Sequence, residues 1–226
     1  MLLLVAGEKG GTGKSTIAVN LAAFMKQEGR DVLLVDTDTQ PSAAMWAATR
    51  GDSELAIAHP IPCVQLKGKI SQDLYDLAGR YEIVVVDAGG RDSIELRFAA
   101  AVATEVVFPV RPGQFDSWTL GKLDKLVEEI RQIANPALKA KLVISCASPN
   151  MMIQEAQEMR EYIKNEGYEH LSLAETVIHE RISYRKAIRD GLGVVEWFDP
   201  KTKKRDQKAV EEIYALYQEI FTKELA

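Results

Sequence analysis

A short segment near the start of the chain has the residue types and spacing of a phosphate-binding loop. Residues 7–16 read Gly-Glu-Lys-Gly-Gly-Thr-Gly-Lys-Ser-Thr. Glycines let backbone N–H groups converge on phosphate oxygens, and the positive end of a following helix favours the same negative charge. A lysine placed like Lys14 reaches the β- and γ-phosphates, and a hydroxyl placed like that of Ser15 can ligate Mg²⁺. The predicted nucleotide-binding residues are Lys9, Gly10, Gly11, Thr12, Gly13, Lys14, Ser15 and Thr16.

The segment departs at one position from the usual G-x-x-x-x-G-K-[ST] pattern. Glu8 stands where the first glycine belongs, and Lys9 follows it. A glycine turn with two solvent-facing lysines is the simpler alternative. An apolar run before the segment and an amphipathic helical pattern after it favour a phosphate site, because such loops join a strand to a helix. The departure at Glu8 is therefore informative about the type of phosphate loop.

Carboxylates end two further apolar segments. Asp36 and Asp38 occupy alternate positions, which places both on one face of a strand. Asp87 follows four apolar residues, 83–86, and an acid in that position can hold Mg²⁺ through a water. Ligands bind at the carboxyl ends of the strands in open α/β sheets, where the glycine loop also lies. We therefore expect one site, although Asp38 could instead cap a helix that begins near Ser42.

The elements that must position these residues alternate between short apolar strands and amphipathic helices. This rhythm predicts an α/β fold in which a doubly wound, mainly parallel sheet lies between two helical layers, as in P-loop NTPases. Strands are expected at residues 2–6, 32–35, 83–86, 106–110 and 142–145. Helices are expected at residues 15–28, 42–49, 70–77, 94–102, 116–133, 153–165, 183–189 and 206–225. The length of 226 residues suits a single domain, residues 1–226.

Composition narrows the class of protein. The net charge of −5 argues against a chain that coats nucleic acid by overall charge, so any DNA contact needs a local patch. No apolar run approaches the ~20 residues that cross a bilayer. Cys63 and Cys146 are too few for a disulfide framework, which suits a reducing cytoplasm, and both are expected in the core.

The sequence Lys-Gly-Gly-Thr-Gly-Lys-Ser at residues 9–15 resembles the deviant Walker A motif of the ParA/MinD superfamily of ATPases. The resemblance implies that Lys9 is the signature lysine, which crosses a dimer interface to the phosphates of the partner. It also implies that Lys14 and Asp38 are catalytic, with Asp38 orienting the attacking water. By the same resemblance Ser15, Asp36 and Asp87 hold Mg²⁺, and ATP drives the formation of a homodimer.

The later part of the chain is similar to small plasmid-partition ParA proteins of the ParF type, which lack a DNA-reading extension before the P-loop strand. Residues 181–208 carry nine Lys or Arg against four acids, which suits sequence-independent contact with DNA phosphates. A solvated charged face is the alternative. The predicted DNA-binding residues are Arg181, Arg185, Lys186 and Arg189.

The leading hypothesis is an ATPase that partitions or positions a cargo. Its ATP-bound dimer would hold nonspecific nucleoid DNA in the cytoplasm, and a cargo-adaptor protein would stimulate hydrolysis and release it. One alternative is a membrane-associated spatial regulator like MinD. Its requirement is a basic amphipathic tail, whereas residues 206–225 are rich in Glu and are expected to pack onto the sheet, so we expect no membrane partner. A metabolic P-loop enzyme of the same fold is the other alternative.

Overall fold

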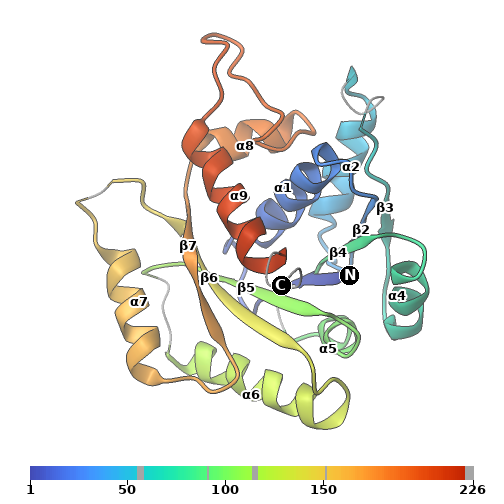
Figure 1. Ribbon diagram of the computed structural model, residues 1–226, viewed down its shortest axis with the longest axis vertical. Helices are drawn as coiled ribbons and strands as arrows, with labels where there is room; N and C mark the ends of the chain where they lie inside the picture. Colours follow the sequence, from blue (N-terminus) through green and yellow to red (C-terminus); the bar gives the residue numbers. More distant parts are fainter. Residues whose placement is uncertain (55–58, 91, 114–116, 151, 222–226) are drawn as a thin grey trace.

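The computed structural model describes residues 1–54, 59–90, 92–113, 117–150 and 152–221 of the chain. Within these residues a seven-stranded sheet forms the centre of the molecule (Figure 1). The strands are β1 (Leu2–Val5), β2 (Val32–Asp36), β3 (Cys63–Gln65), β4 (Ile83–Asp87), β5 (Glu105–Val110), β6 (Lys139–Ala147) and β7 (Ser172–His179).

The helices follow the strands in the alternating order that the sequence predicts. They are α1 (Lys14–Gln27), α2 (Ser42–Gly51), α4 (Ser71–Ala78), α5 (Ile94–Ala100), α6 (Ser117–Ile133), α7 (Glu155–Glu166), α8 (Ile182–Arg189) and α9 (Gln207–Phe221). All the expected helices are present, and their bounds differ from those predicted by a few residues.

The strand order is β3-β2-β4-β1-β5-β6-β7, and each neighbouring pair is parallel. The sheet described is therefore wholly parallel, where the sequence predicts a mainly parallel one. Asp36 lies directly opposite Asp87 in the register of β2 and β4. All the strands end at one edge, so this register brings two predicted site residues together.

Alternate residues of the strands pack into two separate apolar cores, one on each face of the sheet. One core joins the sheet to α1, α2, α8 and α9, and the other joins it to α4, α5, α6 and α7. In β1, Leu3 and Val5 face the first core, while Leu2 and Leu4 face the second. Burial on both faces explains the continuous apolar runs of the central strands, and the predicted three-layer arrangement is confirmed.

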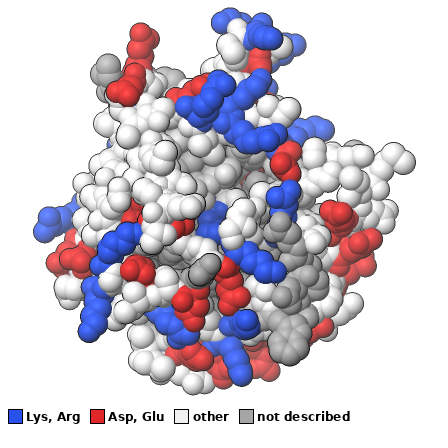
Figure 2. Space-filling view, turned by 180° about the vertical axis from the view of Figure 1, so that it is seen from behind, with Lys and Arg blue, Asp and Glu red and all other residues white. Residues whose placement is uncertain are grey.

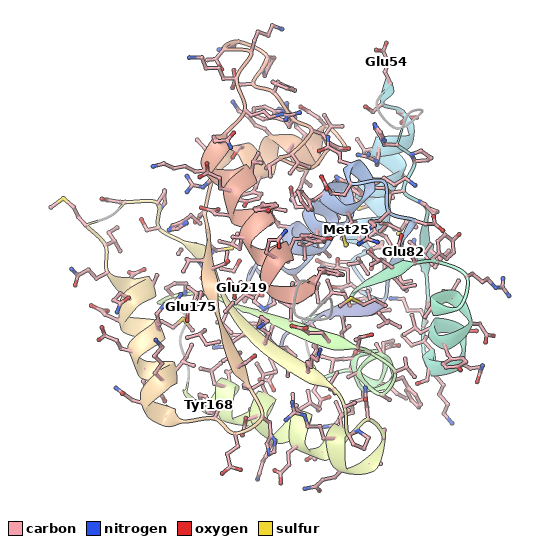
Figure 3. All side chains as sticks on the ribbon, in the orientation of Figure 1. Met25, Glu54, Glu82, Tyr168, Glu175 and Glu219 are labelled. Carbon is pink, nitrogen blue, oxygen red and sulfur yellow. The ribbon has the colours of Figure 1, made fainter. Side chains whose placement is uncertain are left out.

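Strands β3 and β7 are absent from the predicted strands, and both lie at edges of the sheet. In β7 only Ala174 and Ile178 are buried, and the polar Glu175 and Thr176 interrupt the apolar run. Helix α9 covers β7: the Glu219 carboxylate accepts hydrogen bonds from the amides of Glu175 and Thr176. Figure 3 shows Glu219 beside Glu175.

The apolar side of α9 packs inside the protein, as the sequence predicts. Ile213 and Leu216 are fully buried, and the rings of Phe24 in α1 and Tyr217 in α9 lie 4.9 Å apart. Tyr214 is the exception, since half of its side chain is exposed. Among the helices described, none combines the length and the apolarity that spanning a membrane requires.

Candidate functional site

The glycine loop joins β1 to α1 and depends on backbone conformations that glycine favours. Gly13 is the N-cap of α1 with φ 87°, and a Cβ there would lie 2.8 Å from the hydroxyl oxygen of Ser145. No side chain caps α1, and its first turn carries no acid. The amides at the start of α1 are therefore available to a bound anion, next to the positive end of the helix.

Lys14 lies inside the loop rather than in solvent. Its side chain is largely buried, and its ammonium donates a hydrogen bond to the carbonyl of Lys9, 2.8 Å away. Burial lowers the pKa of Lys14, while the charges of Asp87 and Asp38 oppose that shift. A Cβ added to Gly90 would lie 3.2 Å from the Lys14 nitrogen, so the loop after β4 rests on this lysine. The structure thus brings Lys14 together with the acids predicted from the sequence.

Asp87 is a buried carboxylate without a compensating hydrogen bond. It is 1% exposed, and neither of its carboxylate oxygens has a hydrogen-bond partner. Burial raises the pKa of Asp87 to about 7, the nearby Ser15 hydroxyl and Lys14 ammonium lower it, and the charges of Asp36 and Asp38 add to the rise. An unpaired buried carboxylate costs free energy unless a cation joins it. Asp87 and Ser15 therefore fit a hard divalent cation such as Mg²⁺.

The described residues contain no group of three or more His, Cys, Asp or Glu that could hold a metal. Mg²⁺ bound with a nucleotide keeps several waters and takes further ligands from phosphates, so it needs only one or two protein oxygens.

Asp36 and Asp38 have different surroundings despite their spacing. Asp36 is fully buried, and its two oxygens accept hydrogen bonds from the amides of Asp38 (3.0 Å) and Ala44 (2.9 Å). Burial raises the pKa of Asp36, and these amides oppose the rise. Asp36 therefore anchors the start of α2. From the sequence, Asp38 is the residue that could cap this helix.

Asp38 faces the phosphate loop. Its carboxylate accepts hydrogen bonds from the amide of Gln40 and the hydroxyl of Thr39. A Cβ added to Gly89 would lie 3.4 Å from Asp38, so the loop after β4 packs closely against it. Asp38, Gly10 and Gly89 line one open cavity of about 650 Å³. Asp38 is thus half-buried at the mouth of the site, with room beside it for a ligand and water.

Lys9 is half-buried on the first turn of the loop, and the Lys14 ammonium holds its carbonyl. With Glu8 and Thr12 it lines a small apolar cavity against the end of β5 and helix α6. The loop therefore fixes the backbone of Lys9 and places its side chain at the surface of the site.

The two cysteines, both predicted in the core, differ in their placement. Cys63 packs against the core of α1 and α2, and burial raises its pKa to about 12. Cys146 is a correction: it is half-buried beside the phosphate loop, with φ 54° and its sulfur 3.9 Å from the Gly11 carbonyl oxygen. The apolar run before Cys146 does not reveal that β6 ends in a bulge there.

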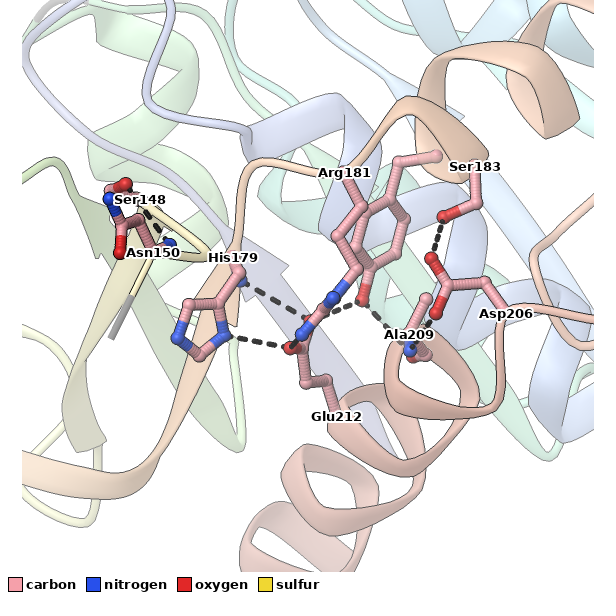
Figure 4. A network of polar contacts seen from close by, with 9 residues as sticks. Ser148, Asn150, His179, Arg181, Ser183, Asp206, Ala209 and Glu212 are labelled. Carbon is pink, nitrogen blue, oxygen red and sulfur yellow. Dashed lines mark hydrogen bonds and ion pairs between the residues drawn. The ribbon is translucent and has the colours of Figure 1, made fainter. Parts of the chain in front are cut away.

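The predicted DNA-binding residues divide into buried and exposed groups. The Arg181 guanidinium donates a hydrogen bond of 2.6 Å to Glu212, which also accepts from His179 and Tyr184 (Figure 4). The Arg181 side chain is only 14% exposed. Within the structure, Arg181 therefore stabilises the junction of α8 and α9.

The other three predicted DNA-binding residues lie nearer the surface. Lys186 pairs with Asp199 at 3.2 Å, and Arg189 pairs with Asp190 at 2.9 Å. Arg185 is exposed and makes no ion pair with any residue that the structure describes. Arg185 and Arg189 are thus accessible from solvent.

A basic hairpin between α8 and α9 completes this surface. Asp199 donates from its amide to the Lys204 carbonyl, and Lys203 donates back to Asp199, which closes a turn. The hairpin, residues 198–206, protrudes at the top of Figure 1, and Figure 2 shows Lys and Arg side chains gathered there. Its exposed cations are Lys201, Lys203, Lys204 and Arg205. The charge count of residues 181–208 includes these four cations, but only the structure separates them from Arg181.

A family model for the CobQ/CobB/MinD/ParA nucleotide-binding domain matches residues 3–194. The chain is 30% identical over 227 residues to the maintenance of carboxysome distribution protein A of Halothiobacillus neapolitanus, and the match covers 96% of this chain and 95% of the relative. It is 31% identical over 163 residues to the chromosome-partitioning ATPase Soj of Thermus thermophilus, covering 61% of this chain and 65% of Soj.

Similarity of fold extends to solved structures. The septum site-determining protein MinD of Pyrococcus horikoshii, complexed with Mg-ADP, superposes with a TM-score of 0.68 at 18% identity. The superposition covers 97% of this chain and 95% of that one.

Proposed function

The chain belongs to the CobQ/CobB/MinD/ParA family and is an ATPase of its ParA/MinD branch, and from this premise we propose that it is a DNA-dependent positioning ATPase. It folds as a single domain, residues 1–226, and dimerises when ATP is bound. The ATP-bound dimer holds nonspecific DNA of the nucleoid in the cytoplasm. A cargo-adaptor protein then stimulates hydrolysis and releases it, which segregates plasmid or chromosome DNA or distributes another cargo.

One observation carries this proposal: two lysines of one glycine loop stand at the strand edge where three carboxylates converge. Lys14 is buried beside Asp87 and Asp38, and its ammonium holds the carbonyl of Lys9. A metabolic P-loop enzyme needs only the lysine that binds its own phosphates. The second lysine, Lys9, suits an enzyme whose site is completed by another copy of the chain, and proteins of this family dimerise and act with partner proteins.

Each residue has a role that its surroundings support. The amides of Gly10, Gly11, Thr12, Gly13, Ser15 and Thr16 bind phosphate oxygens, and Lys14 neutralises the β- and γ-phosphates. The hydroxyl of Ser15 and the unpaired carboxylate of Asp87 hold Mg²⁺, which, when bound, draws charge from the phosphates. Asp36 supports this cation through the loop that it anchors.

Hydrolysis needs a water placed in line with the γ-phosphate and a cation to stabilise the charge of the transition state. Asp38 orients the water, because its carboxylate faces the open cavity beside Gly10 and Gly89. Lys9 supplies the cation to the partner's site. A group supplied in this way raises hydrolysis rates by ~10³–10⁵ in related systems, so the single chain should hydrolyse ATP slowly.

DNA binding rests on the hairpin of residues 198–206 together with Arg185, Lys186 and Arg189. Two acids of this region already have partners within it. Asp199 accepts from its own hairpin amides and pairs with Lys186, while Asp206 accepts from Ser183 and from the amide of Ala209. The hairpin cations Lys201, Lys203, Lys204 and Arg205 are exposed, where DNA phosphates can reach them. Arg181 is also predicted to bind DNA. Here we propose that it contributes indirectly, by stabilising the start of α8.

Among partition ATPases, we propose that the chain works as one of the small ParF type. The membrane-associated alternative is less favoured, because α9 directs Ile213 and Leu216 into the core rather than outward. Lys9 similarly disfavours the metabolic alternative.

Sizing the protein in solution tests the proposal. We expect a dimer with ATP and Mg²⁺, and a monomer with ADP. Lys9→Ala should still bind ATP, but its rate of hydrolysis should not exceed that of the monomeric wild-type chain. A wild-type chain that stays monomeric with ATP, and whose turnover is unchanged by Lys9→Ala, would contradict the proposed role.

A further inference from the structure

The connection between β3 and α4 contacts the loop that carries Asp38 and also helix α5, and residues from both line the open cavity beside Asp38. It runs through residues 66–70, Leu-Lys-Gly-Lys-Ile. The Asp38 loop, residues 37–41, follows β2. Helix α5 comes after β4 along the chain. Neither the glycine loop nor the acidic motifs point to this connection, which lies about 30 residues away from Asp38 along the chain.

The first contacts are with the loop of residues 37–41. The amide of Leu66 donates to the carbonyl of Asp36 at 3.1 Å, which extends the pairing of β2 and β3. The ammonium of Lys67 then donates to the carbonyl of Thr37 at 2.8 Å and to the carbonyl of Asp38. One cation therefore holds two successive carbonyls of the backbone that aims the Asp38 carboxylate.

The next contacts are with α5. The amide of Gly68 donates to the Glu95 carboxylate at 2.9 Å, and the hydroxyl of Ser71 donates to the carbonyl of Phe98 at 2.7 Å. Gly68 has φ 77°, a conformation that glycine adopts at little cost and that turns its amide toward α5. The Gly68 amide lowers the pKa of Glu95, which keeps this carboxylate ionised.

These contacts converge on the proposed reaction site. Lys67, Asp38, Gly89 and Glu95 line the same open cavity. Lys67 and Lys69 are both exposed, but Lys69 makes no hydrogen bond or ion pair with the described residues, whereas Lys67 donates to two carbonyls. The contrast shows that Lys67 is not simply one more surface lysine of this segment.

We propose that Lys67 is a positioning residue for ATP hydrolysis, and that Lys67, Gly68 and Glu95 form a bridge which makes the Asp38 loop and α5 move together. The proposal rests on the proposed role of Asp38, through which Lys67 acts. Lys67 touches backbone carbonyls and not the reacting groups. Its loss therefore leaves the phosphate loop intact and misplaces Asp38.

Rates of hydrolysis test the positioning role. Lys67→Met keeps the aliphatic stem and removes the ammonium, Lys67→Arg restores a cation, and Lys69→Met is the matched control. With saturating MgATP, Lys67→Met should hydrolyse ATP about tenfold to a hundredfold more slowly, the range for a misplaced catalytic group. Its dissociation constant for ATP should be unchanged. Lys67→Arg should recover most of the rate, and Lys69→Met should match wild type.

Two results would overturn the positioning role: a Lys67→Met rate equal to that of wild type, or a Lys67→Arg rate as low as that of Lys67→Met. Asp38→Ala in the same assay separates this failure from failure of the proposed function. If Asp38→Ala hydrolyses ATP normally, the role of Asp38 is wrong. If only Asp38→Ala is inactive, the positioning role of Lys67 alone is wrong.

Amide hydrogen exchange tests the bridge without relying on activity. Glu95→Ala should speed exchange of the amides at residues 37–40, although no hydrogen bond within the described residues joins Glu95 to that loop. Lys67→Met should do the same, and Lys69→Met should not. Faster exchange confined to α5 and residues 66–70 in Glu95→Ala would show that the Asp38 loop and α5 are independent, and would overturn the bridge.

Discussion

The ammonium of Lys14 donates a hydrogen bond to the backbone carbonyl of Lys9 across the phosphate loop, at 2.8 Å. The lysine proposed to bind phosphate in its own chain thus holds the segment that carries the lysine proposed to act on the partner chain. A phosphate that drew the Lys14 ammonium away would remove this donor from the Lys9 carbonyl.

Lys14→Gln is expected to weaken ATP binding by at least about tenfold, since a charged hydrogen bond contributes roughly 1.5–3 kcal/mol. The glutamine amide can still reach the Lys9 carbonyl, so the fold without nucleotide should persist. Titration with a fluorescent ATP analogue and a thermal melt measure the two effects. Lys122→Gln, on the exposed side of α6, is the control. Wild-type affinity in Lys14→Gln would refute the phosphate role.

Asp87→Asn should stabilise the protein without nucleotide and remove its response to Mg²⁺. The buried carboxylate has no hydrogen-bond partner, and such a group costs roughly 1–3 kcal/mol. Urea unfolding at pH 8 with EDTA should therefore show a higher midpoint for the variant. In wild type, MgATP should raise the midpoint and EDTA should abolish much of this rise. An equal MgATP effect in both proteins would show that Asp87 does not hold the cation.

Removing the charges of the hairpin should release DNA while leaving ATP-dependent dimerisation intact. The variant combines Lys201→Gln, Lys203→Asn, Lys204→Gln and Arg205→Gln, where asparagine suits the left-handed backbone at position 203. Each lost phosphate contact should flatten the dependence of log K on log[salt] by about 0.9.

The matched control for the hairpin removes four exposed lysines elsewhere, namely Lys69, Lys122, Lys125 and Lys164, each changed to Gln. It should bind DNA nearly as wild type does, although its net charge falls equally. Equal losses in both variants would indicate general charge attraction rather than a hairpin contact. Retention of DNA by the hairpin variant would remove residues 198–206 from the proposed interface.

Acid should weaken the junction of α8 and α9. Burial alone would raise the pKa of Glu212, but hydrogen bonds from His179 and Arg181 and the charge of Arg181 outweigh it and lower the pKa. Since the folded pKa lies below the unfolded one, ionised Glu212 contributes stability above the unfolded pKa. That stability is lost as pH falls through the folded pKa, below about 4.5.

Glu212→Gln should flatten this part of the dependence of stability on pH and lower stability near neutral pH, because Arg181 loses its buried partner. Urea unfolding between pH 3 and pH 7 measures both effects. Glu211→Gln, at the exposed neighbouring position, should leave the profile unchanged. An identical acid response in Glu212→Gln would assign the pH dependence to other carboxylates.

The central part of the fold follows directly from local sequence signals. The apolar run at residues 83–86 indicates a strand that is buried on both faces. The glycines around Gly13 indicate a loop between a strand and a helix. The order of strand, loop and helix can therefore be predicted from the sequence. Strand β7 lacks such a signal, because an edge strand needs burial on fewer sides and tolerates Glu175 and Thr176.

Within the site, the sequence indicates which acids converge but not how each is used. Asp36 and Asp38 share a strand face by their spacing, yet Asp36 turns to the amide of Ala44 while Asp38 stays beside the cavity. The choice depends on how α2 is placed after Pro41. Lys67 and Arg181 are similar cases, since their partners lie far away along the chain and only tertiary packing decides between an exposed cation and a fixed one.

The packing of α9 on α1 has a consequence for how the protein is made. Phe24 of α1 lies against Tyr217 of α9, and Ile213 and Leu216 share the core that covers α1. The ribosome synthesises α1 long before α9, so the apolar side of α1 that α9 covers is exposed to solvent during most of translation. Nascent chains therefore cannot complete the support of their phosphate loop until residues 207–221 have emerged.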